Sequence, residues 1–73
     1  MACVNPDGKP TESGTKMLRA LQAGSKSPEE VALETGPPLF KVRSGLRETT
    51  QAGLTEEHED RYKLTEKGAK LIE

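Results

Sequence analysis

The sequence has few of the residues that build disulfide-linked or metal-stabilised small proteins. Of its 73 residues, one is cysteine, one is histidine and none is tryptophan. A lone Cys3 excludes a disulfide within the chain and a Cys-x-x-Cys metal pair, which favours a reducing, intracellular setting. Because Phe40 and Tyr62 are its aromatic residues, the chain must build a thin core from aliphatic side chains.

Long apolar runs are also missing. No stretch approaches the roughly 18 residues that a transmembrane helix needs. The first ten residues, "MACVNPDGKP", have neither a basic start nor an apolar segment, so we expect no signal peptide and a cytoplasmic protein. The net charge of -1 gives no general attraction to nucleic acid, so any such attraction must be local.

The chain divides into an N-terminal arm over residues 1–12 and one domain over residues 13–73. The arm contains Asn-Pro-Asp-Gly, which favours a turn, and we expect it to be flexible. From Ser13 the pattern becomes helical, and we expect Gly24 to end this helix as a left-handed residue. The apolar face of this first helix consists of Met17, Leu18 and Leu21.

The clearest helix start lies in "SPEEVALETG". Ser27 is a predicted N-cap, Pro28 suits the first helical position, and Glu30 completes a capping box. Val31 and the alanine after it should face inward. Gly36 should end the helix after about two turns.

A third helix is predicted after Pro37-Pro38, where a helix can begin but not continue from upstream. Gly53 should end it, and Gly45 inside it should cost about 1 kcal/mol relative to alanine. Such a glycine indicates tight packing, close approach of a partner, or nothing in particular. The inward face of this helix is predicted to contain Leu39, Val42, Leu46 and Thr49.

A hairpin and a fourth helix follow. Leu54, Tyr62 and Leu64 alternate with polar residues, as strands with one buried face do. Thr65 is a predicted N-cap for the last helix. Leu71 and Ile72 are expected to return to the core.

This order of elements is the layout of a winged helix-turn-helix, a mainly α fold with a small β-hairpin. The segment "VRSGLRETTQAGLTEEHEDRYKLTEKGAKL" resembles the recognition helix and wing of MarR-like and ArsR-like transcriptional regulators. Its most specific parts are Gly53-Leu54 and "RYKLTEKG". Thr49 departs from the pattern, because these families usually have a larger apolar residue there, which suggests an under-filled core or an altered helix angle.

The resemblance implies a small DNA-binding module and a transcriptional regulator, with the helix at about 38–52 in the major groove. Arginine and lysine can read guanine edges or neutralise phosphates, although cations on a helix face are also ordinary solvated residues. The candidate DNA-binding residues are Lys41, Arg43, Ser44, Arg47 and Thr50. Further candidates for contacts to the DNA backbone are Lys26, Arg61 and Lys63, with weaker grounds for Lys16 and Arg19.

The hairpin tip argues against the usual role of a wing, because phosphates would repel its carboxylates. The acidic residues of the tip are Glu56, Glu57, Glu59 and Asp60. The alternative function is therefore a protein-interaction winged helix whose acidic wing docks on a basic partner. His58 among these carboxylates is a weak metal signal, and a solvated loop is the favoured interpretation.

The sequence contains no phosphate-binding Gly-rich loop, nucleophile elbow or paired catalytic histidine and acid. We therefore expect a protein that is not an enzyme and that needs neither cofactor nor metal. Dimerisation would have to use the last helix or the N-terminal arm.

Overall fold

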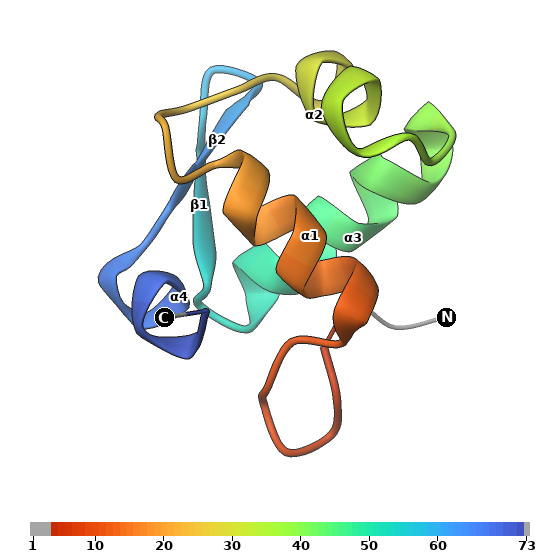
Figure 1. Cartoon of the computed structure of the whole chain (residues 1–73). Coiled ribbons are helices and arrows are strands. Elements are labelled where there is room, and N and C mark those ends of the chain that lie inside the picture. The colour runs from red at the N-terminus through yellow and green to blue at the C-terminus, as the bar shows by residue number, and fades with distance from the viewer. Residues whose placement is uncertain (1–3, 73) are drawn as a thin grey trace.

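A computed structural model describes residues 4–72 as a group of helices with one β-hairpin (Figure 1). The chain is a winged helix-turn-helix, as predicted. In Figure 1 the three N-terminal helices lie together, the hairpin runs beside them, and the last helix lies at the open end of the hairpin. The elements are α1 (Glu12–Ala20), α2 (Pro28–Thr35), α3 (Leu39–Gln51), β1 (Thr55–His58), β2 (Arg61–Leu64) and α4 (Glu66–Leu71).

The segment before α1 forms a closed loop. Val4 and Pro10 form an isolated antiparallel bridge, and the Asn5 backbone N–H donates to the Lys9 carbonyl at 2.7 Å. Thr11 then caps α1, which begins one residue before the predicted start. The flexibility of residues 1–12 stays a prediction, and Cys3 lies outside the described residues.

The end of α1 differs from the prediction. The helix ends at Ala20 with Leu21 as its C-cap, so Gly24 is not the residue that terminates it. Gly24 instead belongs to a further turn, in which its N–H donates to the Leu21 carbonyl at 3.1 Å. The backbone leaves the helix through short-range turn bonds, which satisfy the last carbonyls without a left-handed residue directly after the helix.

The predicted caps of α2 are confirmed. The Ser27 side chain accepts a hydrogen bond from the Glu30 N–H at 3.2 Å, and the Ser27 N–H donates to the Glu30 carboxylate at 2.8 Å. Gly36 has φ +98°, in the left-handed region, and ends the helix. Val31 is fully buried, whereas Leu33 on the opposite face is 87% exposed.

The core consists of two clusters that meet at α1. One contains Met17, Leu21, Val31, Val42 and Leu46. The other contains Leu18, Leu54 and Ile72. The prediction that Leu71 also joins the core was wrong, because it is 38% exposed. Successive residues near a helix end point in different directions, so Ile72 takes the core position and leaves Leu71 at the surface.

The hairpin closes with a two-residue turn. β1 and β2 pair antiparallel in a register that places Glu57 opposite Tyr62 and His58 opposite Arg61. Glu59 and Asp60 have φ values of +52° and +65°. Positive φ at both central residues is the geometry of a type I′ turn, which matches the twist of the strands.

A third segment extends the hairpin. The Lys26 N–H donates to the Tyr62 carbonyl at 2.9 Å, and the Tyr62 N–H donates back to the Lys26 carbonyl at 2.8 Å. These bonds fix β2 to the connection between α1 and α2. The position of the wing relative to the helices is therefore set by backbone contacts as well as by side-chain packing.

Thr49 and Gly45 lie on the inner side of α3. Thr49 is fully buried, and its hydroxyl donates to the Leu46 carbonyl at 2.9 Å and lies 3.0 Å from the hydroxyl of Thr55. The hydroxyl at this buried position is thus hydrogen-bonded. Gly45 is buried, so its place in the helix is a packing position.

The helices are short. The longest, α3, has 13 residues, and no helix within residues 4–72 is long and apolar enough to cross a membrane.

Candidate nucleic-acid interface

The buried face of α3 packs against the core, and its exposed face carries basic side chains. Val42 and Leu46 are buried, and they anchor the helix to the rest of the core. Arg43, Ser44 and Arg47 are exposed. Because residues four apart share a helix face, Arg43 and Arg47 project from the same side of α3. The structure therefore brings together three of the five residues predicted to contact DNA.

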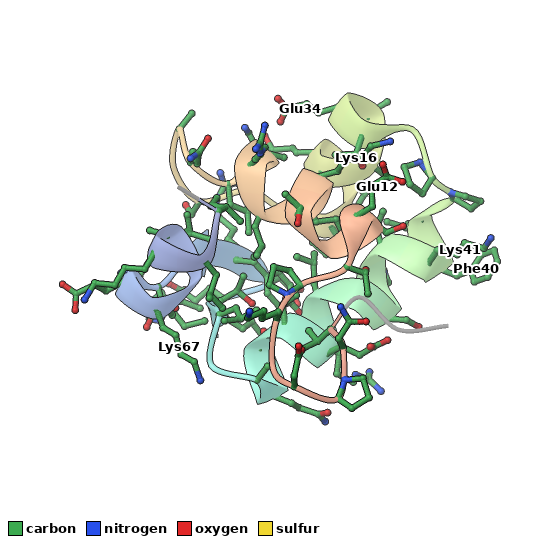
Figure 2. All side chains as sticks on the ribbon, turned by 60° about the horizontal axis from the view of Figure 1, so that its bottom comes forward. Glu12, Lys16, Glu34, Phe40, Lys41 and Lys67 are labelled. Atoms are coloured by element: carbon green, nitrogen blue, oxygen red, sulfur yellow. The ribbon has the colours of Figure 1, made fainter. Side chains whose placement is uncertain are left out.

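Lys41 lies on another side of α3, toward α1. In Figure 2 it projects beside Phe40 at the N-terminal end of the helix. Phe40 is 68% exposed, which is unusual for one of two aromatic residues in a small chain. Both side chains lie in the first turn of α3.

Thr50 has a structural role. Its hydroxyl lies 2.9 Å from that of Thr55, and its side chain is half-buried. The hydrogen bond ties this hydroxyl to the start of the wing, although Thr50 lies on the same side of α3 as Arg43 and Arg47.

A carboxylate from α2 meets the first of the two arginines. Arg43 Nη2 lies 3.4 Å from Glu29 Oε2, and about 60% of each side chain is exposed. Water screens such a pair strongly, so it is weak and exchangeable. Glu29 nevertheless places a negative charge beside Arg43.

The second arginine shares a hollow with the wing. This hollow, of about 370 Å³, is lined on one side by Arg43, Arg47 and Thr50 and on the other by Glu57, Asp60 and Tyr62. Burial raises the pKa of the Tyr62 hydroxyl, and the carboxylates of Glu57 and Asp60 raise this pKa further, while the two arginines act in the opposite direction. The acidic inner side of the wing thus faces the basic side of α3.

The cations expected to contact the DNA backbone all have partners within the fold. Lys26 Nζ lies 2.7 Å from Glu34 Oε2 and donates to the Ala20 carbonyl, which ties the end of α1 to α2. Lys63 pairs across the hairpin with Glu56 at 3.2 Å.

Arg61 has the largest set of these contacts. Its Nη2 donates to the Ser25 carbonyl at 2.8 Å, its Nε donates to the Ser25 hydroxyl at 3.3 Å, and its Nη1 lies 3.3 Å from Glu30. The Ser27 N–H, which donates to the Glu30 carboxylate, lowers the pKa of that carboxyl, and the Arg61 charge adds to the effect. Arg61 therefore connects strand β2 of the wing with Ser25, before α2, and with Glu30 in the first turn of α2.

The tip of the wing is open and acidic. Glu56, Glu57, Glu59 and Asp60 are exposed, and His58 Nε2 lies 3.2 Å from Glu59 Oε1. Across residues 4–72, no three side chains of the metal-binding types converge on a point.

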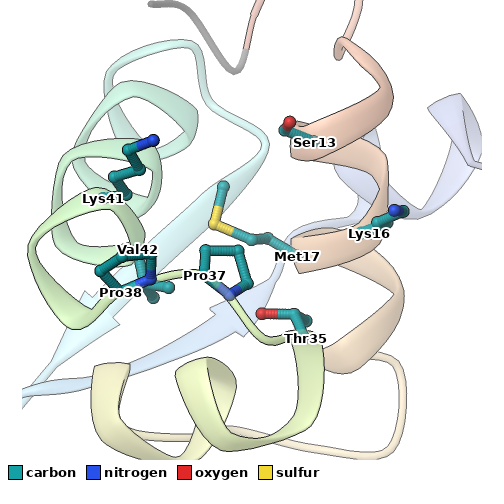
Figure 3. Close-up of a pocket in the computed structure, with 8 residues that line it drawn as sticks. All are labelled: Ser13, Lys16, Met17, Thr35, Pro37, Pro38, Lys41 and Val42. Carbon is teal, nitrogen blue, oxygen red and sulfur yellow. The ribbon is translucent and has the colours of Figure 1, made fainter.

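A groove between α1 and α3 was not anticipated from the sequence. Its lining includes Lys16 and Met17 from α1, Pro37 from the turn, and Lys41 and Val42 from α3 (Figure 3). In the sequence, Met17 and Val42 indicated only core positions. The sequence signal nearest to this groove is the prolyl pair between α2 and α3, because Pro37 and Pro38 both line it.

Comparisons with known proteins support the fold. No protein-family model matches the chain, and no curated protein matches it. A similar solved structure is the crystal structure of CalO1, a methyltransferase in calicheamicin biosynthesis, in its SAH-bound form, with 30% identity and a TM-score of 0.72. The match covers 81% of this chain and 18% of the methyltransferase chain. This chain is a winged-helix module that resembles a minor part of that enzyme.

Proposed function

We propose that this chain is a small DNA-binding module, of the kind used in transcriptional regulation, whose helix α3 enters the major groove. The observation that carries the proposal is the exposed face of α3, where Arg43, Ser44 and Arg47 lie beside one another. A major groove admits an α-helix, and arginine side chains at this spacing can reach base edges or phosphates. Lys41 at the start of the helix adds a third cation.

The wing has no part in this contact. Its carboxylates are exposed, and Arg61 and Lys63 already have acidic partners. Binding would depend on α3 alone and would therefore be weak. If Lys41, Arg43 and Arg47 each neutralise one phosphate, the logarithm of the affinity should fall with the logarithm of the salt concentration with a slope of about −2.7.

The carboxylates near α3 should compete with DNA. Glu29 pairs with Arg43, and Glu57 and Asp60 face Arg47 across the hollow. Removing the charge of one such carboxylate should strengthen DNA binding by about two- to fivefold, the range expected for an exposed charge pair.

The test is a titration of the amide shifts of the labelled chain with a short duplex at two salt concentrations. We expect shifts confined to residues 41–50 that fade with salt. The variants Arg43→Gln and Arg47→Gln should each reduce the salt slope by about 1. Lys70→Gln on α4 is the matched control, because this exposed lysine lies on a different helix from the proposed interface. Unchanged shifts at a large excess of duplex would contradict the proposal.

A second candidate is a protein-interaction module. The observation that favours it is the wing, on which the side chains of Glu56, Glu57, Glu59 and Asp60 are all exposed. In this case a basic peptide should shift the amides of residues 56–60 while duplex DNA leaves residues 41–50 unchanged. Neither candidate assigns a chemical step to the chain. The methyltransferase activity belongs to the matched protein, and the match covers 18% of that protein's chain.

A further inference from the structure

The groove between α1 and α3 has an apolar floor and a rigid wall. It encloses about 260 Å³. Met17 and Val42 form the floor and are almost completely buried, with 4% and 1% of their surfaces exposed. The rings of Pro37 and Pro38 lie along the turn that joins α2 to α3, and their fixed backbone angles make this wall stiff (Figure 3).

The volume of the groove limits what it can hold. Sites for cofactors and drug-sized ligands usually enclose about 300–1,000 Å³. A smaller groove that is open to solvent suits one apolar side chain projecting from a larger partner. A peptide segment that buries a single leucine or phenylalanine in such a groove is a common form of protein recognition.

Two lysines stand on opposite sides of this groove. Lys16 projects from α1 and Lys41 from α3, with Met17 between them (Figure 3). Neither lysine has a carboxylate within ion-pair distance in the part of the chain that the structure describes. By contrast, four other cations each lie within ion-pair distance of a glutamate, namely Lys26, Arg43, Arg61 and Lys63. The cations beside the apolar floor are thus available to a partner.

We infer that this groove binds an acidic segment of a partner protein. One apolar side chain of the segment would lie against the exposed rings of Pro37 and Pro38, above the buried Met17 and Val42, and carboxylates on either side of it would pair with Lys16 and Lys41. The acidic wing of a second copy does not fit this description, because Glu56–Asp60 contains no apolar residue. The inference is independent of DNA binding, although both would use Lys41, so a bound segment would compete with DNA.

The probe is a displayed library of random 12-residue peptides, panned against the folded chain. We expect the selected peptides to contain an apolar residue flanked by aspartate or glutamate. A synthetic copy of a selected peptide should shift the amides around Met17 and Lys41. Replacement of its apolar residue by glycine should abolish these shifts, which tests the floor of the groove without altering the folded chain.

Charge reversal on the protein tests the rim. Lys16→Glu and Lys41→Glu should each weaken binding of the acidic peptide by about two- to fivefold, whereas Lys70→Glu should leave it unchanged. Panning against the double variant K16E/K41E should select basic in place of acidic flanking residues. Selection of peptides without an acidic bias, or amide shifts confined to the wing, would overturn the inference. Because the assay contains no DNA, its result is separate from that of the duplex titration.

Discussion

A β-carbon added at Gly68 would lie 2.1 Å from the backbone oxygen of Leu54. Gly68 lies in α4, and Leu54 directly precedes β1. The last helix therefore packs directly against the backbone at the base of the wing. Thr65 secures the same junction, since its hydroxyl accepts from the Gly68 N–H at 3.1 Å and donates to the Gly53 carbonyl at 2.7 Å. The fourth helix therefore fixes the base of the wing.

Gly68→Ala should destabilise the chain by about 2 kcal/mol, because the added methyl group meets backbone that cannot move without displacing α4. Urea unfolding followed by circular dichroism measures this loss. Lys70→Ala, at an exposed position of the same helix, is the control and should change the stability little. A loss for Gly68→Ala below about 0.5 kcal/mol would show that the junction can relax.

The hydroxyls of Thr49, Thr50 and Thr55 form a connected group in which Thr55 is the common member. Thr55→Val leaves the other two hydroxyls without this partner and should cost about 1–2 kcal/mol. In the double variant T49V/T55V both members of the buried pair become apolar. The sum of the single losses should therefore exceed the loss in the double variant by at least about 0.5 kcal/mol. A double-mutant cycle in urea measures the coupling, and strict additivity would contradict the proposed network.

The turn at Glu59 and Asp60 has positive φ at both residues, where glycine and asparagine are favoured. Asp60→Gly should therefore stabilise the chain by up to about 1 kcal/mol, through relief of an unfavourable left-handed conformation. Asp60→Ala is the matched control, because it removes the same charge and keeps the unfavourable backbone. Equal thermal stability of the two variants would show that charge, and not backbone conformation, controls this turn.

The capping box makes stability depend on pH. The hydrogen bond from the Ser27 N–H lowers the pKa of the Glu30 carboxyl in the folded chain. A carboxyl with a lowered folded pKa contributes stability above its unfolded pKa and loses it as the pH falls through the folded pKa. The stability difference between the natural chain and Glu30→Gln should therefore be present at pH 7 and shrink as the pH falls below about 4.5. Unfolding curves between pH 7 and pH 3 measure it, and a difference independent of pH would contradict this account.

Local patterns predicted the elements well. The capping box of α2 requires residues three apart, so it could be recognised from Ser27 and Glu30 alone. The buried face of α3 followed from helical spacing, and the hairpin from alternation around Tyr62. The two errors, at Gly24 and Leu71, both concern helix ends. Turn hydrogen bonds end α1 before Gly24 is reached, and Ile72 occupies the core position that was predicted for Leu71 as well.

The sequence by itself determined the winged helix-turn-helix, because its caps, glycines and apolar spacing act over a few residues. The tertiary structure decided which cations remain available. Arg61 donates a hydrogen bond to the carbonyl of Ser25, which lies 36 positions away in the chain. Arg43 forms an ion pair with Glu29 from another helix. Lys16 and Lys41 are left without acidic partners among residues 4–72, on opposite sides of an apolar groove. Such pairings depend on how the helices pack, so no local pattern could have indicated them.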